Sequence, residues 1–189
     1  MPRTETMTSR ERVLTALGHG VPDRVPIDFG GFQTGIQRGA YEELLGHLGI
    51  ADDTVMLDPV QQLAAPCEAV LERFHVDTRY VVAHGPDSFR GGIVVNERDG
   101  RLWHDLRDEF GVVWSMPDDQ GLYMDISHHP LAEAVIGDIA RYPFPKGNDP
   151  SRFTGVRDRL ETMRRTTDYA LVSGIGGVVY ETCWYMRGL

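Results

Sequence analysis

The sequence has few cysteines and no long apolar run, and both scarcities narrow the classes of protein that it can encode. Its 189 residues include two cysteines, Cys67 and Cys183. Two are too few for a disulfide framework, so we expect a reducing, cytoplasmic location. The N-terminal residues are polar and lack the apolar centre of a signal peptide. No run of about 18 apolar residues occurs, so no membrane span is expected.

Positive charge is also scarce. The formal net charge is -9, and charged residues make up 25% of the chain. This balance argues against a nucleic-acid-binding surface, because such a surface needs basic patches. It leaves open a small anionic substrate, since a local arginine cluster can override a global charge. The overall composition is that of an ordinary globular protein, and a small molecule is the expected partner.

The stretch Val25–Gly35 predicts a short buried strand that opens into a glycine-rich loop. Gly30, Gly31 and Gly35 allow the backbone to turn sharply and to approach a ligand closely. Asp28 falls near the end of the expected strand, where a carboxylate can bind substrate, hold a proton or simply cap the loop. A strand, a loop and a following helix are how an α/β enzyme presents site residues, although a purely structural turn fits the same pattern.

Helices and strands alternate on both sides of this stretch. Thr8 and Glu11 have the spacing of a capping box at a helix start. Apolar stripes at helical spacing predict helices over 41–48, 67–74 and 153–163, and the second stripe makes Cys67 a core thiol. Further strands are expected at 77–83 and 169–173, and the continuous apolar end of the first suits a sheet buried on both faces. The alternation predicts a largely parallel α/β fold.

Residues 91–116 contain short apolar segments separated by a turn signal, a pattern that predicts an antiparallel β insertion. Asp99-Gly100 is a strong hairpin signal between two apolar segments. Later in the chain, the glycines of 174–177 follow an expected strand, but Val179 stands where a dinucleotide fingerprint needs its last glycine. A tight βα turn is therefore predicted at 174–177.

Several of these segments together resemble the uroporphyrinogen decarboxylase superfamily. The similar stretches are 7–17, 22–26, 71–79, 129–145 and 174–188, so the resemblance covers nearly the whole chain. It implies a (β/α)8 TIM barrel of roughly 340 residues. Residues 1–189 would then form a single truncated domain, the N-terminal half of the barrel, with the β insertion at 91–116.

Two chemistries occur in that superfamily. The decarboxylases remove carboxyl groups from a tetrapyrrole and use an arginine-rich loop directly after the first strand. The related methyltransferases move methyl groups between a corrinoid protein and an acceptor, with zinc held by a His-x-Cys pair and a distant cysteine. Here the two arginine positions fall on Gly31 and Gly35, which lack the guanidinium groups that grip carboxylates. The resemblance therefore favours the methyltransferase-like side.

Positions beside the predicted glycine loop and the same comparison together supply the candidate site residues. Asp28 and His84 are the candidate catalytic residues; His84 falls where the decarboxylases carry an acidic residue, and imidazole titrates in a range suited to proton transfer. The alternative for His84 is a solvated loop histidine. For Trp184 and Tyr185, on the last expected helix, the alternative is a pair of core aromatics. The candidate substrate-binding residues are Gly31, Gln33, Gly35, Arg38, Trp184 and Tyr185.

No metal site is predicted within these residues, because no His-x-Cys pair occurs. Zinc and a corrinoid partner are expected only for a full-length relative, and this chain alone is expected to be inactive. Two alternatives stay open at this point. One is a decarboxylase-like carboxy-lyase with a rebuilt anion site. The other is a non-catalytic half-barrel that associates with another chain through its open edge.

Overall fold

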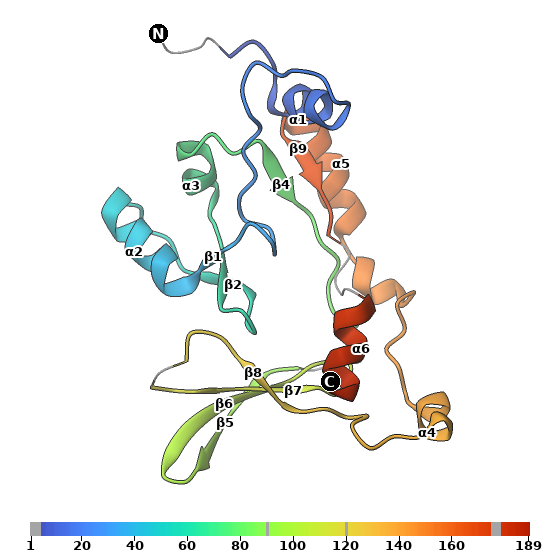
Figure 1. Cartoon of the computed structure of the whole chain (residues 1–189). Helices are drawn as coiled ribbons and strands as arrows, with labels where there is room; N and C mark the ends of the chain where they lie inside the picture. Colours follow the sequence, from blue (N-terminus) through green and yellow to red (C-terminus); the bar gives the residue numbers. More distant parts are fainter. Residues whose placement is uncertain (1–4, 90, 120, 175–178) are drawn as a thin grey trace. The chain divides into compact units, whose positions relative to one another are not determined.

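The computed structural model describes residues 5–89, 91–119, 121–174 and 179–189, and the chain folds into two compact units (Figure 1). The first unit comprises 1–58, 63–83 and 154–175, and the second comprises 59–62, 84–153 and 176–189. Each unit has its own cluster of buried hydrophobic side chains.

The helices of the first unit are α1 Ser9–Leu17, α2 Arg38–Leu48, α3 Glu68–Arg73 and α5 Val156–Thr166. Local signals set the start of α1 and the end of α2, whereas α5 begins three residues after the apolar stripe that predicted it. The predicted capping box is present, since the amide of Glu11 donates to Thr8 Oγ1 and the Glu11 carboxylate accepts from the Thr8 amide. Helix α2 ends at Gly49, whose φ of 65° is a conformation that glycine adopts without cost.

The strands of the first unit form two small sheets. Strands β1 (Ile36–Gln37), β2 (Val55–Asp58) and β3 (Leu63–Ala65) pair antiparallel in the order β1-β3-β2. Strands β4 (Thr78–Tyr80) and β9 (Ala170–Val172) pair parallel. The hydrophobic cluster of this unit is formed by side chains of α2, β3 and α3. Its buried members are Tyr41, Leu45, Ala64 and Val70. Cys67 is half-buried against this cluster.

The stretch that was expected to be the first strand does not form one. Residues 25–29 have no regular secondary structure, and Val25 and Ile27 are exposed rather than buried. The Ile27 carbonyl accepts from the amide of Asp77, just before β4, while the Ile27 amide donates to the Asp77 carboxylate. A side chain thus takes the place of a strand partner, and Pro26 has no amide to donate to a sheet.

The second unit is built on a four-stranded antiparallel sheet with the order β5-β6-β7-β8. Its strands are β5 Ile93–Arg98, β6 Arg101–Arg107, β7 Val113–Pro117 and β8 Asp125–His128. The hairpin predicted at Asp99-Gly100 is present, and the sheet continues beyond residue 116 into β8. The helical elements are α4 Ile136–Arg141, a 3-10 turn at Pro150–Phe153 and α6 Val179–Arg187.

The expected TIM barrel half is wrong. Among the described residues there are three separate small sheets, and β4 with β9 is the one parallel pair. The remaining strands pair antiparallel, without the repeated strand–helix alternation of a barrel. The strands expected at 77–83 and 169–173 do pair with each other. Which strands pair is decided by contacts between distant segments, and an apolar run does not specify its partner. The glycine turn expected at 174–177 falls mostly outside the described residues.

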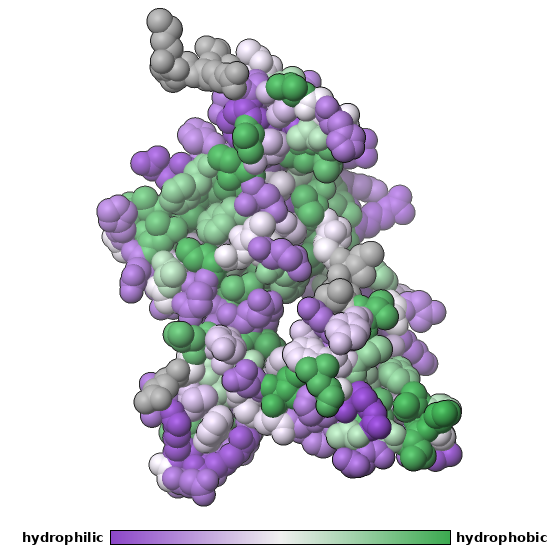
Figure 2. All heavy atoms as spheres, viewed as in Figure 1, coloured by the Kyte–Doolittle hydropathy of each residue, from purple (hydrophilic) through white to green (hydrophobic). Residues whose placement is uncertain are grey.

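The surface carries many apolar side chains (Figure 2). In β5, Ile93, Val94 and Val95 are about half exposed. Within the described part of the chain, no helix is long and apolar enough to cross a membrane.

Candidate functional site

The Asp28 carboxylate lies at the centre of a group of hydroxyls in the first unit. Thr78 Oγ1 donates to its Oδ1, Tyr80 Oη donates to its Oδ2 at 2.8 Å, and Thr34 Oγ1 donates to Oδ2 at 3.2 Å. Thr78 and Tyr80 are alternate residues of β4 and therefore project from the same side of the strand. The side chain of Asp28 remains exposed, so an external hydrogen-bond donor can reach this carboxylate.

The glycine loop closes around this group by tight packing. A Cβ atom built on Gly31 would lie 2.4 Å from Cζ of Tyr80, so the tyrosine ring fills the space of a side chain at this position. A Cβ on Gly35 would lie 2.9 Å from both the Gly31 carbonyl oxygen and Leu63 Cδ1. Gly30 has a φ of 96°, a backbone conformation that residues other than glycine rarely adopt. All three glycines therefore have structural reasons for their identity.

Burial of the ring raises the pKa of Tyr80, and its hydrogen bond to Asp28 adds to this effect. The phenol favours its neutral form because it donates to a carboxylate, and a phenolate would be repelled by the same carboxylate. Tyr80 therefore acts as a fixed donor that orients Asp28. Asp28 itself remains exposed, so a ligand can reach it.

A buried ion-pair network beside this group joins three distant segments of the chain. Arg12 Nη1 lies 2.6 Å from Asp77 Oδ1, and Arg12 Nε lies 2.6 Å from Asp23 Oδ1. Arg24 Nη1 binds the second oxygen of Asp77 at 2.6 Å. Arg12 is 1% exposed and Asp77 is fully buried. These residues belong to three of the stretches that carried the family resemblance, and their role here is to hold the fold together.

The second unit contains a cavity of about 370 Å³ with aromatic walls. Helix α6 contributes Trp184 and Tyr185, and strand β7 contributes Trp114. The ring centroids of Trp114 and Tyr185 are 4.9 Å apart with an angle of 79° between the planes, and those of Trp184 and Tyr185 are 4.6 Å apart at 51°. The other lining residues are Met124, Asp125, Ile126, His129 and Leu189.

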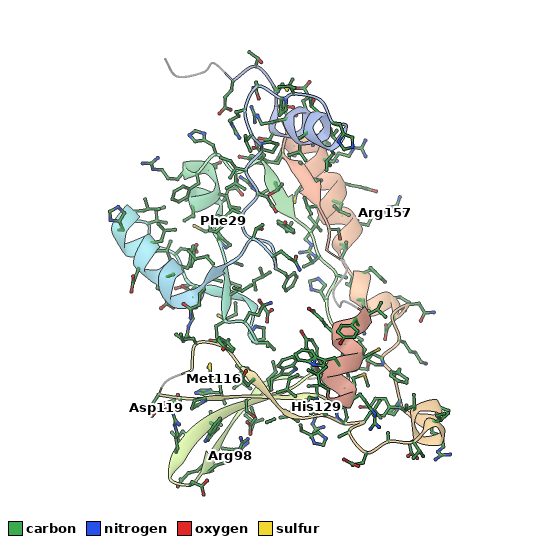
Figure 3. All side chains as sticks on the ribbon, in the orientation of Figure 1. Phe29, Arg98, Met116, Asp119, His129 and Arg157 are labelled. Atoms are coloured by element: carbon green, nitrogen blue, oxygen red, sulfur yellow. The ribbon has the colours of Figure 1, made fainter. Side chains whose placement is uncertain are left out.

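Hydrogen bonds fix two sides of this cavity. The indole Nε1 of Trp114 donates to Asp108 Oδ2 at 3.0 Å. His129, labelled in Figure 3, follows β8, and its Nδ1 lies 2.8 Å from the carbonyl oxygen of Tyr185. Because a carbonyl oxygen only accepts, Nδ1 carries the hydrogen and donates. The chain after β8 is thereby tied to α6.

The structure divides the predicted site residues between the two units. Asp28, Gly31, Gln33, Gly35 and Arg38 belong to the first unit; His84, Trp184 and Tyr185 belong to the second. Gln33 is exposed in the loop, and Arg38 is exposed at the first position of α2. His84 is exposed, and its amide donates to the carbonyl of Arg152. The shared pocket expected for these residues thus stays a prediction.

Thr34, Thr78 and Tyr80 were missed as partners of Asp28, and Trp114 was missed as a partner of Tyr185. A usable signal existed for Thr78 and Tyr80, because they are alternate residues of a strand expected from the sequence and so project from the same side. Trp114 lies about seventy positions before Tyr185 in the sequence, and no local pattern connects them.

Potential metal ligands are dispersed in the described part of the chain, where no three His, Cys, Asp or Glu side chains gather into a site. The zinc expected for a full-length relative stays a prediction. Comparisons with protein families, with curated proteins and with solved structures yield no match. The family resemblance stays a prediction from the sequence.

Proposed function

We propose that this chain takes part in corrinoid-linked methyl transfer, on the methyltransferase-like side of the uroporphyrinogen decarboxylase superfamily. The sequence resemblance supports the class of reaction. The packing of Tyr80 against Gly31 supports the choice between the two chemistries. The proposal concerns the site around Asp28, and it does not include a barrel.

That packing is the observation that carries the proposal. A decarboxylase substrate presents several carboxylates and needs guanidinium partners. Position 31 has no room for an arginine while the Tyr80 ring stays in place. The nearby charged group is instead the Asp28 carboxylate, which repels anions. A neutral or cationic donor suits this site better, so the carboxy-lyase alternative loses support.

Asp28 would hold the ligand by accepting a hydrogen bond. Its geometry is preset by Thr78 and Tyr80, so little ordering is needed when the ligand arrives. A bound corrinoid would supply the methyl group when present. The cytoplasmic location inferred from the cysteine content remains part of this proposal.

The test is binding of methylcobalamin to the purified chain, measured by titration calorimetry. We expect saturable binding that Asp28→Asn weakens about tenfold, the effect of losing one hydrogen bond to a charged group. Asp53→Asn is the matched control, because this substitution removes the same negative charge at another exposed position. Absence of binding contradicts the proposal, as does loss of carboxylates from uroporphyrinogen III on incubation with the chain.

Turnover is a separate prediction. We expect no methyl transfer by this chain alone, since the described residues gather no zinc ligands. Metal analysis and a methyl-transfer assay on the same preparation check this. Stoichiometric zinc together with turnover would show that the expectation of inactivity is wrong.

We also propose that the chain self-associates through β5. Among the residues that the structure describes, this strand is at the edge of its sheet, so one row of its backbone groups has no partner strand there. Ile93, Val94 and Val95 are consecutive β-branched residues with exposures of 47%, 58% and 53%. Antiparallel pairing with β5 of a second copy would cover the apolar side chains and satisfy the backbone groups.

Light scattering coupled to size-exclusion chromatography tests this association. We expect a concentration-dependent dimer that Val94→Lys converts to monomer, because an edge lysine blocks strand pairing. Ile136→Lys is the control, since Ile136 is exposed on helix α4 and offers no strand edge. A monomer at all concentrations, or equal effects of the two variants, would count against the β5 interface.

A further inference from the structure

The aromatic cavity of the second unit has the wrong shape for a flat ligand. The ring planes of Trp114 and Trp184 are inclined to that of Tyr185 by 79° and 51°, so the three rings do not present parallel faces. Stacking of a planar macrocycle needs parallel faces at van der Waals distance. The volume of about 370 Å³ is near the lower end of ligand sites, which span about 300–1,000 Å³. The cavity therefore suits a small, rounded ligand.

The electrostatics of the cavity favour a cation. The faces of indole and phenol rings are negative, and several rings at steep angles attract one cation from more than one side. Asp125, from β8, adds a carboxylate to the wall. Within the described part of the chain, this carboxylate makes no ion pair. No arginine or lysine is among the described lining residues.

The walls are held in place without a ligand. Trp114 is oriented by its bond to Asp108, which also accepts from the amides of Phe110 and Val112. Tyr185 is fixed through its carbonyl by His129. A preformed cavity loses little conformational entropy on binding, which is how a small ligand reaches useful affinity.

We propose that this cavity binds a methylated ammonium cation. Such a cation is compact and apolar at its surface, and its positive charge is spread over the methyl groups. It can therefore contact aromatic faces without losing strong hydrogen bonds to water, which an unmethylated ammonium would lose. The inference rests on the cavity of the second unit and is independent of the site around Asp28.

Choline and its neutral isostere 3,3-dimethylbutan-1-ol provide the test. The two molecules share shape and hydroxyl group and differ in one central atom, nitrogen or carbon. We expect titration calorimetry on the full chain to give a choline affinity at least about tenfold above that of the isostere. Equal affinities, or no binding of choline, overturn the inference. Its outcome is separate from that of the methylcobalamin titration, which reports on the proposed reaction.

Three variants locate the binding. Trp184→Leu keeps an apolar wall and is expected to abolish the preference for choline. Asp125→Asn is expected to weaken choline binding about threefold while the isostere is unaffected. Asp119→Asn is the matched control, because Asp119 is exposed and pairs with Arg101 away from the lining residues. If Trp184→Leu does not fold, Asp125→Asn decides: an unchanged choline affinity places the site elsewhere.

Discussion

Replacing Asp77 with asparagine is expected to lower the free energy of unfolding by about 3–5 kcal/mol, the cost of breaking a buried ion pair by removing one partner. Asp77 is fully buried, and both of its carboxylate oxygens accept from guanidinium groups of Arg12 and Arg24. Asparagine keeps the shape but leaves Arg12, which is 1% exposed, without its full counter-charge. Against a total stability of about 5–15 kcal/mol, such a loss removes a large fraction.

Urea unfolding followed by circular dichroism measures this change, and the two units provide an internal comparison. All three tryptophans, Trp103, Trp114 and Trp184, belong to the second unit. Tryptophan fluorescence therefore reports on the second unit, and circular dichroism reports on the helices of both. A separation of the two transitions would identify the first unit as the part that unfolds early, and coincident transitions would show that both units unfold together.

Glu161→Gln is the control for charge removal. Glu161 pairs with Arg157 on the exposed face of helix α5, with exposures of 61% and 88% (Figure 3). An exposed pair of this spacing contributes about 0.3–0.5 kcal/mol. If Asp77→Asn changed the free energy of unfolding no more than Glu161→Gln does, the buried network would not be the main tie between these segments.

The same network predicts acid sensitivity. Burial opposes ionisation of Asp77, but hydrogen bonds from Arg24, Ile27, Ser9 and Arg12 outweigh it and lower the pKa. The pKa of Asp23 is lowered chiefly by the hydrogen bond from Arg12. Because both folded-state values lie below the unfolded value, this stabilisation is complete above about pH 4 and is lost as pH falls through the folded pKa values. Asp77→Asn should therefore flatten the decline of stability in acid.

Local signals in the sequence predicted local structure well. The capping box at Thr8 and the stripe ended by Gly49 each involve residues within one or two turns of a helix. The hairpin at Asp99-Gly100 is equally local. In each case the determining contacts are between near neighbours in the sequence, so the pattern contains most of the information.

The misassigned parts depend on contacts between distant residues. Val25–Phe29 has the apolar character of a strand, yet it binds the Asp77 side chain about fifty positions later. Arg12 and Asp77 are 65 positions apart, and neither residue type alone indicates a buried pair. The same holds for the candidate site: Asp28 was predicted from its place near the end of the expected strand, whereas its orientation by Thr78 and Tyr80 depends on how β4 lies beside that stretch.

Gly31→Ala is expected to destabilise the first unit by about 1–3 kcal/mol, the usual cost of overpacking. The added Cβ would lie 2.4 Å from Cζ and 2.5 Å from Oη of Tyr80, so the ring must move away. That movement breaks the hydrogen bond between Tyr80 and Asp28. The pKa of Tyr80, raised by burial and by this bond, should return towards the ordinary value for tyrosine. Thermal unfolding and a spectroscopic phenol titration, with Tyr80→Phe to assign the signal, measure both effects.

Gly46→Ala gives the opposite expected sign and serves as control. Gly46 is inside helix α2, and a Cβ there meets nothing within 4 Å. Alanine should therefore stabilise the helix by about 0.5–1 kcal/mol. In a Tyr80→Leu background the cost of Gly31→Ala should largely disappear, because the ring that causes the clash is gone. A neutral or stabilising Gly31→Ala in the natural background would contradict the packing argument.

Gly31→Arg extends this test to function. The guanidinium group would have to displace Tyr80 before it could reach a substrate carboxylate, and Asp28 would then compete for it as an ion-pair partner. We expect this variant to lose stability without gaining affinity for a polycarboxylated tetrapyrrole. Tight, salt-sensitive binding of uroporphyrin by Gly31→Arg would show that one side chain separates the two chemistries, and that the ring of Tyr80 does not close the site to anions.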